Sequence, residues 1–311
     1  MNSIEWDGSQ ITKGGVYSDV PIDRYHKDPN LFAGPSVSKS ALKRIFRPLK
    51  GSPKAFWGRW YCNPDHVIDP PSDALNFGKA AHCLILGDES FSANYALRPE
   101  VWDSYRKKEA REWKVQVYEQ CKTPVTLQDL ETIKSIADEL KTNPYVQSGI
   151  LDGEIERTIV AKDPETGIYL RMRPDCIPSE GMYSDFKTAA DLSERFLVNQ
   201  VRDCGYHIQA GTIKKVCQIL DLPFKSFSLV YGLKNEVSDS AAVELDPADV
   251  DLGMRMVEKG LREIRQGPDT GTWAGHQPFD DGAHFLRMSS WDREKAEEYL
   301  SNDDFEHLEA A

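Results

Sequence analysis

Apolar and polar residues alternate most regularly in the middle of the chain. Residues 168–175 follow this period of two, and residues 181–187 follow it again after a short turn. Such alternation is typical of half-buried β-strands. A third run covers residues 154–161, and the turn sequence at 163–167, with its proline and glycine, connects this run to the one at 168–175. Because the connections are short, the pattern predicts an antiparallel meander of three strands.

Helical spacing of apolar residues dominates on both sides of these strands. Thr126 and Asp129 resemble a capping box, and the apolar stripe that continues to Leu140 predicts a core helix. A strand at 224–231 follows two helices, so a right-handed crossover and a mixed sheet are expected. Residues 1–35 are rich in Gly, Pro and Asp and are expected to form an irregular arm. The other predicted helices cover residues 38–47, 52–61, 73–87, 103–121, 192–203, 205–221 and 247–266.

Two of the predicted strands carry charged residues at functionally suggestive positions. Asp175, after a proline, ends one strand, and Asp185 and Lys187 stand on the next. Because side chains alternate across a strand, Asp185 and Lys187 share one face while Phe186 points to the other, toward a core. Pairing of the two strands would bring Asp175 beside Asp185.

This combination of residue types suits the hydrolysis of a phosphodiester. A divalent cation offsets the charge of the phosphate and makes water a better nucleophile. Two carboxylates can hold such a cation, and a neighbouring lysine can orient or deprotonate the water. The pattern therefore indicates a metal-dependent nuclease. Taken alone, it is equally compatible with a solvated hairpin, because short combinations of Asp and Lys arise by chance in a chain with 28% charged residues.

Two predicted helices carry further candidates. His82 is the single imidazole of the helix at 73–87, where a histidine is either a structural residue or a ligand. Tyr206 and Gln209 lie on or near one face of the helix at 205–221. That face is either a packing stripe or a binding surface.

Taken in chain order, these candidates resemble a known nuclease family. The ordered set consists of Gly78-x-x-x-His82, Glu156, Arg-Pro-Asp175, Asp-Phe-Lys187 and Tyr-His-x-Gln209. It resembles the exonuclease VIII (RecE-like) branch of the PD-(D/E)xK nucleases, and the likeness covers roughly residues 36–275. The resemblance implies an α/β, restriction-endonuclease-like fold in which helices flank a mixed central sheet. Within the expected single domain, residues 36–150 form a helical N-terminal part and residues 151–275 the catalytic sheet core.

The resemblance also implies roles for residues at matching positions. Asp175 and Asp185 would be the principal metal ligands, together with the backbone carbonyl of Phe186. Lys187 would position the attacking water and stabilise developing negative charge. His82 would be a further ligand or a close neighbour of the metal. The expected cofactor is Mg²⁺, for which Mn²⁺ can substitute.

Other family positions leave alternatives open. Glu156 matches a family acid near the metal, but Glu154 shares its strand face, so either glutamate can be the site acid. Tyr206 and Gln209 would contact substrate phosphate or hold the catalytic lysine. The related helicase-associated nucleases carry Gln-x-x-x-Tyr, whereas Ile213 stands at that tyrosine position here. Tyr206 is therefore the expected aromatic partner.

Charge is distributed unevenly along a chain whose net charge is -12. Residues 38–60 contain seven basic residues, no acidic one and several aromatic ones. Such a stretch is typical of a DNA-contacting patch, or of a basic solvated helix face whose aromatic side chains enter the core. Residues 276–311 are expected to form an acidic tail that discourages unspecific adhesion to DNA. The expected substrate contacts, besides Tyr206 and Gln209, are Arg173, Lys39, Lys43, Arg44 and Arg47.

Composition sets outer limits on the class of protein. With 311 residues and 40% hydrophobic content, the chain can bury one sizeable core. No segment has the apolar length of a membrane span and no signal pattern opens the sequence, so a cytoplasmic protein without membrane contact is expected. The six cysteines include no Cys-x-x-Cys pair, which argues against a zinc ribbon.

The expected activity, implied by the resemblance alone, is 5′-to-3′ digestion of linear double-stranded DNA from its ends in phage-type recombination. The resemblance also implies a homo-oligomeric ring that threads DNA, and a single-strand annealing recombinase as partner. Two alternatives remain open. One is a PD-(D/E)xK nuclease that is single-strand-specific or endonucleolytic, and the other is a non-catalytic DNA-binding relative.

Overall fold

The computed structural model describes residues 3–69, 72–87, 91–276 and 286–301. The chain forms two compact units, residues 1–275 and residues 276–311. The smaller unit contains helix α12 (Ser290–Ser301), whose side chains are exposed. This helix forms part of the expected acidic tail, and residues 277–285 and 302–311 of that tail lie outside the described residues.

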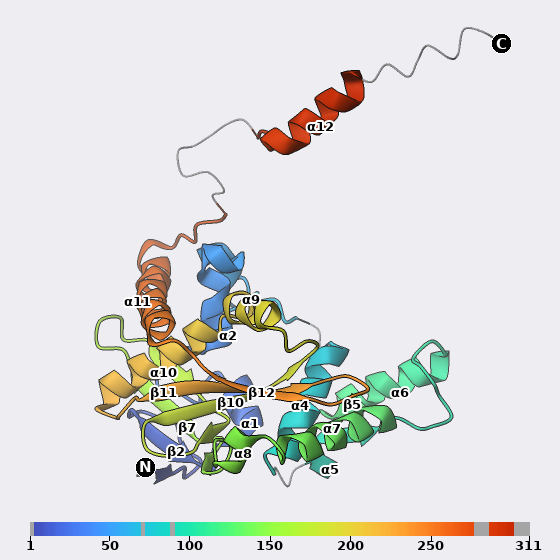
Figure 1. The fold of residues 1–311 in the computed structure, drawn as a ribbon. Coiled ribbons are helices and arrows are strands. Elements are labelled where there is room, and N and C mark those ends of the chain that lie inside the picture. Colours follow the sequence, from blue (N-terminus) through green and yellow to red (C-terminus); the bar gives the residue numbers. More distant parts are fainter. Residues whose placement is uncertain (1–2, 70–71, 88–90, 277–285, 302–311) are drawn as a thin grey trace, which may run out of the picture. The chain divides into compact units, whose positions relative to one another are not determined.

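A five-stranded mixed sheet forms the centre of the larger unit (Figure 1). Its order is β12-β11-β10-β9-β6, with β10 and β11 parallel and the other neighbours antiparallel. Helices α9 (Glu194–Cys204) and α10 (Tyr206–Leu220) connect β10 to β11, as the predicted crossover requires. The strands are β6 (Glu154–Ile155), β9 (Cys176–Ile177), β10 (Met182–Ala189), β11 (Ser226–Leu233) and β12 (Ser240–Glu244).

The N-terminal segment contributes to a second five-stranded sheet, of order β1-β2-β7-β8-β3. Its strands are β1 (Ile4–Glu5), β2 (Gly15–Ser18), β3 (Ser36–Val37), β7 (Thr158–Lys162) and β8 (Tyr169–Met172). Tyr17, Tyr25 and Leu31 are buried in one cluster with residues of this sheet, and Tyr25 belongs to helix α1 (Ile22–Lys27). The prediction of an irregular arm at residues 1–35 is therefore wrong. The segment packs on β7 and β8 through isolated apolar residues. Because these residues follow neither the helical nor the strand period, the sequence pattern did not reveal the packing.

The predicted three-strand meander is divided between the two sheets. β7 and β8 pair antiparallel as predicted, but the run at 154–161 breaks at Glu156, whose φ is 50°. The residues before this break form β6 and join the central sheet. The chain changes sheets again after β8, at Pro174, and forms β9 beside β10. Proline cannot donate to a strand ladder, which suits this second break.

Helices cover both faces of the central sheet (Figure 1). Tyr183 and Tyr231 pack on the side of α10, with α11 behind it, whereas Phe186 and Val230 pack with α4 and α7. This alternation follows from the period of two along β10 and β11. The covering helices are α4 (Asp73–Ile85), α7 (Leu127–Leu140) and α11 (Pro247–Thr270).

Helices α10 and α11 cross at two glycines. A Cβ added to Gly211 would meet the backbone of Gly253 and Met254, and one added to Gly253 would meet the carbonyl of His207. The two helices therefore pack backbone against backbone. This contact fixes the position of α10, which carries Tyr206 and Gln209.

The remaining elements are short. The predicted helix at 38–47 breaks into a helical turn and two 3₁₀ turns, and the chain then passes through Lys50 with a φ of 59°. The capping box at Thr126 and Asp129 is confirmed, with both reciprocal hydrogen bonds present. These elements are α2 (Lys39–Leu42), η1 (Lys43–Ile45), η2 (Arg47–Leu49), α3 (Pro53–Trp57), α5 (Phe91–Asn94), β4 (Tyr95–Leu97), α6 (Lys108–Glu119), β5 (Thr123–Val125) and α8 (Pro144–Gln147).

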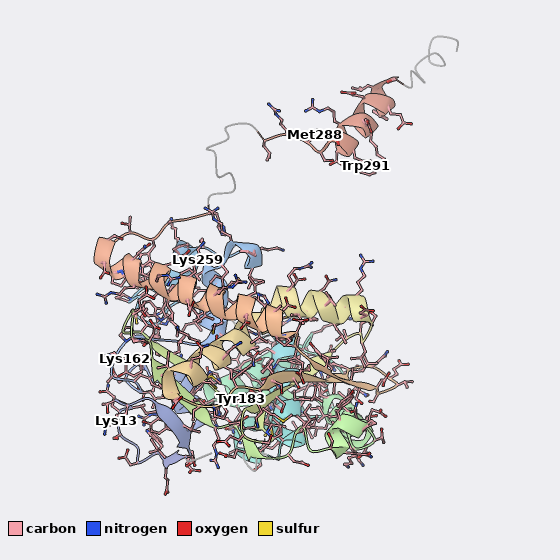
Figure 2. All side chains as sticks on the ribbon, turned by 60° about the vertical axis from the view of Figure 1, so that its left-hand side comes forward. Lys13, Lys162, Tyr183, Lys259, Met288 and Trp291 are labelled. Carbon is pink, nitrogen blue, oxygen red and sulfur yellow. The ribbon has the colours of Figure 1, made fainter. Side chains whose placement is uncertain are left out.

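The larger unit separates an apolar interior from a charged surface. Tyr183 is buried within it, whereas the side chains of Lys162 and Lys259 are exposed (Figure 2). Within the described part of the chain, no helix combines the length and apolar character needed to cross a membrane.

Candidate active site

Asp175 lies directly before β9, at the edge of β10. β9 pairs with β10 through Ser184, so the backbone at Phe186 extends past this pairing. The Phe186 N–H donates a hydrogen bond of 2.7 Å to Asp175 Oδ2, and His82 Nδ1 lies 3.2 Å from the same oxygen. The structure thus brings His82 of α4 and the backbone of Phe186 to one carboxylate.

Asp185 and Lys187 share the α10 face of β10, as the alternation predicts. Gln209 of α10 donates a hydrogen bond of 2.8 Å from Nε2 to Asp185 Oδ1. The Lys187 ammonium contacts Asp185 Oδ2 and donates a hydrogen bond of 3.2 Å to the carbonyl oxygen of Phe186. Because Asp185 is only 2% exposed, these contacts hold its carboxylate in a nearly water-free position.

The electrostatic surroundings of this cluster lower the pKa of both Asp175 and Lys187. Burial raises the pKa of Asp175, but the nearby His82 and Lys187 outweigh burial and hold this pKa below its usual value. Burial lowers the pKa of Lys187, and the charge of Asp175 offsets part of that effect. A carboxylate ready to bind a cation therefore faces a lysine suited to orienting water.

Tyr206 forms an aromatic wall next to Lys187. Its ring centroid lies 5.7 Å from Lys187 Nζ and 5.0 Å from Lys39 Nζ. Tyr206 opens helix α10 after Gly205, whose φ of 68° makes the turn from α9 that a glycine tolerates best. Burial, followed by the positive charge of Lys187, lowers the pKa of Lys39 to about 7.

Glu156 and Arg173 form an ion pair beside the cluster. Arg173 Nη2 lies 3.0 Å from Glu156 Oε2, and Arg173 Nη1 also donates to the carbonyl of Val20. The Glu156 N–H donates a hydrogen bond of 3.0 Å to the Asp175 carbonyl oxygen. Glu156 is therefore next to Asp175 in the backbone, while its carboxylate is engaged by Arg173. The carboxylate of the other candidate, Glu154, lies 3.1 Å from Arg157 Nε.

The basic stretch at 38–60 does not act as one uniform surface. Lys39 enters the cluster, whereas Arg44 pairs with Asp69, which also pairs with Arg59. Arg47 is exposed and Lys43 is half-buried. Three of its aromatic side chains are buried, as the packing alternative expects of the aromatic residues. These are Phe46, Phe56 and Trp60.

Comparisons with known proteins agree with this geometry. Residues 40–276 match the family model described as "PDDEXK-like domain of unknown function (DUF3799)". The chain belongs to this family. A comparison with curated proteins finds no match. Six chains of solved structures match, among them a crystal structure from Eubacterium rectale described as a "putative exonuclease". That chain is 13% identical with a TM-score of 0.58, and the match covers 89% of this chain and 98% of the other.

The PDDEXK-like domain has the fold class that the sequence predicts. It is an α/β nuclease-like domain with mixed sheets flanked by helices, and its fold is shared with the E. rectale protein. At 13% identity, this likeness shows a shared fold and nothing more.

The PDDEXK-like site offers oxygen donors that suit a hard divalent cation. Asp175, Asp185 and the Phe186 carbonyl supply them, and the Lys187 ammonium already contacts two of the three. In the described ranges, no group of three or more His, Cys, Asp or Glu side chains is arranged to hold a metal ion. The oxygen donors at this place are two carboxylates and a backbone carbonyl.

Sequence reasoning missed two residues that face the cluster, Tyr231 and Cys204. Tyr231 is paired with Lys187 in the register of β10 and β11, and its hydroxyl is buried. The Cys204 thiol at the end of α9 donates a hydrogen bond to the Gln200 side chain. Burial is the main cause of the raised pKa of the Tyr206 phenol, and the nearby Cys204 thiol is the second cause. Only the strand register and the turn at Gly205 reveal these positions, and neither follows from a motif.

Proposed function

We propose that this PDDEXK-like domain is a metal-dependent deoxyribonuclease that hydrolyses phosphodiester bonds. The observation that carries the proposal is the convergence of Asp175, Asp185 and Lys187 at one edge of β10, with Gln209 holding Asp185. Those are the residue types that phosphodiester hydrolysis needs, and they come together from separate segments of the chain.

Asp175, Asp185 and the Phe186 carbonyl would hold Mg²⁺, or Mn²⁺ in its place. Bound there, the cation would supply charge for the scissile phosphate and a more acidic water. His82 orients Asp175 from one face of the sheet, and Gln209 occupies Asp185 Oδ1, so that Asp185 Oδ2 is left for the cation. Lys187 would then release Asp185 and orient the attacking water through its ammonium.

We further infer that the enzyme is a 5′-to-3′ exonuclease on linear duplex DNA. Support comes from the ordered set of motifs that resembles the exonuclease VIII branch, and from the fold shared with a protein described as a "putative exonuclease". The same resemblance supports a ring-shaped homo-oligomer that acts with a single-strand annealing recombinase in phage-type recombination. Lys43, Arg47 and Lys39 are the basic residues proposed to face the DNA backbone.

A digestion of end-labelled DNA tests these steps together. Linear duplex labelled at the 5′ or the 3′ end is compared with closed circular duplex and with single strands, in Mg²⁺ and in EDTA. We expect digestion of the linear duplex alone, with early release of the 5′ label, and no digestion in EDTA. Cutting of the circle, or of single strands alone, would replace the exonuclease with an endonuclease or a single-strand-specific nuclease.

Lys187→Met provides the matched test of the site. This variant keeps the length of the side chain and removes its charge, so we expect cleavage to fall at least 100-fold while the fold persists. Lys134→Met is the control, because Lys134 is exposed on α7. Equal activity of the two variants would refute the assignment of Lys187, and inactivity of the unsubstituted protein on every DNA would favour a non-catalytic relative.

A further inference from the structure

Tyr231 has a buried hydroxyl group without a hydrogen-bond partner among the described residues. The residue is 1% exposed and stands directly across from Lys187 in the parallel pairing of β11 with β10. Neighbouring residues of paired strands present their side chains on the same face, so Tyr231 faces the side of α10. Burial and the nearby Cys204 thiol both raise the pKa of its phenol. A buried hydroxyl without a partner is costly, and in native proteins it normally meets a water or a ligand oxygen.

Lys39 reaches the same place from helix α2. Its ammonium and that of Lys187 both lie over the ring of Tyr206, at 5.0 and 5.7 Å from the centroid. Lys187 has a carboxylate partner in Asp185, but no described carboxylate forms an ion pair with Lys39. Two partly buried ammonium groups therefore stand close together with one counter-charge between them, which is an unfavourable arrangement in the absence of an anion.

We propose that Lys39, Lys187 and Tyr231 line a phosphate-binding recess that receives the non-bridging oxygens of a DNA phosphate beside the carboxylates of Asp175 and Asp185. This assignment rests on the proposed nuclease function and identifies the residues that hold its substrate. The Tyr206 ring forms the wall between the two lysines, and the Tyr231 hydroxyl donates to a phosphate oxygen. The carboxylate side of the cluster keeps the cation, so cation and phosphate occupy adjoining places.

The donor types favour a phosphate over other small anions. Asp185 already balances the charge of Lys187, so the ammonium of Lys39 matches the single negative charge of a phosphodiester. The second non-bridging oxygen is left for a neutral donor, which a phenol supplies. A water molecule could satisfy Tyr231, but it would leave the charge of Lys39 without a counter-ion. Lys39 also differs from Arg44 of the same basic stretch. Arg44 is already paired with Asp69, whereas Lys39 is not paired with an acid and can therefore bind an anion.

Binding measured without cleavage tests the recess. The full chain is titrated with a fluorescent duplex oligonucleotide in EDTA, and again in Ca²⁺, at several salt concentrations. The variants are Lys39→Met, Tyr231→Phe and the double variant, with Lys134→Met as the control for loss of a lysine from an exposed site. Thermal unfolding of each variant accompanies the titrations.

We expect Lys39→Met to weaken binding about ten-fold or more and to reduce the slope of log affinity against log salt by about 0.9, the value of one phosphate contact. Tyr231→Phe should weaken binding by roughly five-fold to ten-fold without a change of slope, because it removes a neutral donor. It should not lower the melting temperature, since the hydroxyl has no protein partner to lose. The losses in the double variant should be smaller than the product of the single losses, because both groups hold one phosphate.

Several results would overturn the recess. One is Lys39→Met binding DNA as tightly as Lys134→Met does, and another is an unchanged salt slope. If Tyr231→Phe had a lower melting temperature but unchanged DNA binding, the hydroxyl would have a role in packing only. If the unsubstituted protein did not bind DNA, DNA phosphate would not be the ligand of the recess. These outcomes are separate from the proposed function: a protein that binds DNA through the recess but does not cut it keeps the recess and loses the nuclease.

Discussion

Gln209 is the residue through which helix α10 holds the carboxylate of Asp185. Its amide donates to Oδ1 over 2.8 Å, and the burial of Asp185 makes that contact hard for water to replace. Partners of this kind orient a metal ligand without touching the metal. We therefore propose that Gln209 positions Asp185.

Gln209→Met should consequently weaken the response to the cation. We expect cleavage at low Mg²⁺ to fall about 10-fold to 100-fold and to recover in part at high Mg²⁺, because the ligand is displaced but still present. The measurement is the initial rate of DNA digestion as a function of Mg²⁺ concentration. Gln218→Met is the control, since Gln218 is exposed on the same helix. A loss that stays the same at every Mg²⁺ concentration would contradict a role in holding Asp185.

The lowered pKa of Lys39 predicts how the free energy of unfolding depends on pH. Its pKa in the fold is about 7, below the ordinary value of 10.5, so above pH 7 the unfolded chain binds more protons at this position than the folded chain. The free energy of unfolding must then rise as the pH increases from 7 toward 10.5. Lys187, whose pKa burial also lowers, contributes in the same direction.

Urea denaturation at pH 7 and pH 8, below the usual pKa of tyrosines and thiols, measures this effect. We expect the unsubstituted chain to gain on the order of 1 kcal/mol over this interval, a value reduced for the partial exposure of Lys39. Lys39→Met should remove a large part of the gain. The same pH dependence in both proteins would show that Lys39 titrates normally in the fold.

Among the elements, the contact between α10 and α11 depends on the absence of side chains at Gly211 and Gly253. Gly253→Ala places a methyl group against the His207 carbonyl, where only backbone could move. We expect a loss of about 1–3 kcal/mol in the free energy of unfolding, the usual cost of overpacking. Because α10 carries Gln209, nuclease activity should fall with it.

Gly78→Ala, in helix α4, is the matched control for Gly253→Ala. The nearest atom to a Cβ at Gly78 would be Thr188 Oγ1 at 3.8 Å, an ordinary contact, and alanine is the better helix former by about 1 kcal/mol. Chemical denaturation of both variants should therefore show opposite signs. Equal stability of Gly253→Ala and the unsubstituted chain would mean that α11 can move away from α10.

Local signals predicted elements better than their pairing. The helix after Thr126 was predictable because the capping residues and the apolar stripe lie within one short segment. The face shared by Asp185 and Lys187 followed from strand alternation in the same way. By contrast, the division of the meander between two sheets depends on a left-handed φ at Glu156 and on distant strand partners, which leave no periodic mark in the sequence. Tyr231 escaped notice for that reason, since only the register of β10 with β11 places it across from Lys187.

At the scale of the whole larger unit, the N-terminal segment is part of the framework that supports the site. Tyr17, Tyr25 and Leu31 belong to one buried cluster with Val160 of β7. The carbonyl of Val20 accepts a hydrogen bond from Arg173, which in turn holds Glu156 next to Asp175. A segment that resembles a loose arm in sequence therefore connects, through three successive contacts, to the candidate metal ligand.

Leu31→Ala tests whether this segment is structural. Leu31 is 0% exposed, so truncation should lower the free energy of unfolding by about 2–5 kcal/mol through lost burial and a new cavity. Leu286→Ala, at a residue that is 87% exposed, should change it by less than about 0.5 kcal/mol. Urea denaturation of both variants provides the comparison. If Leu31→Ala were as mild as Leu286→Ala, residues 1–35 would be a dispensable arm after all, and Arg173 and Glu156 would keep their positions without it.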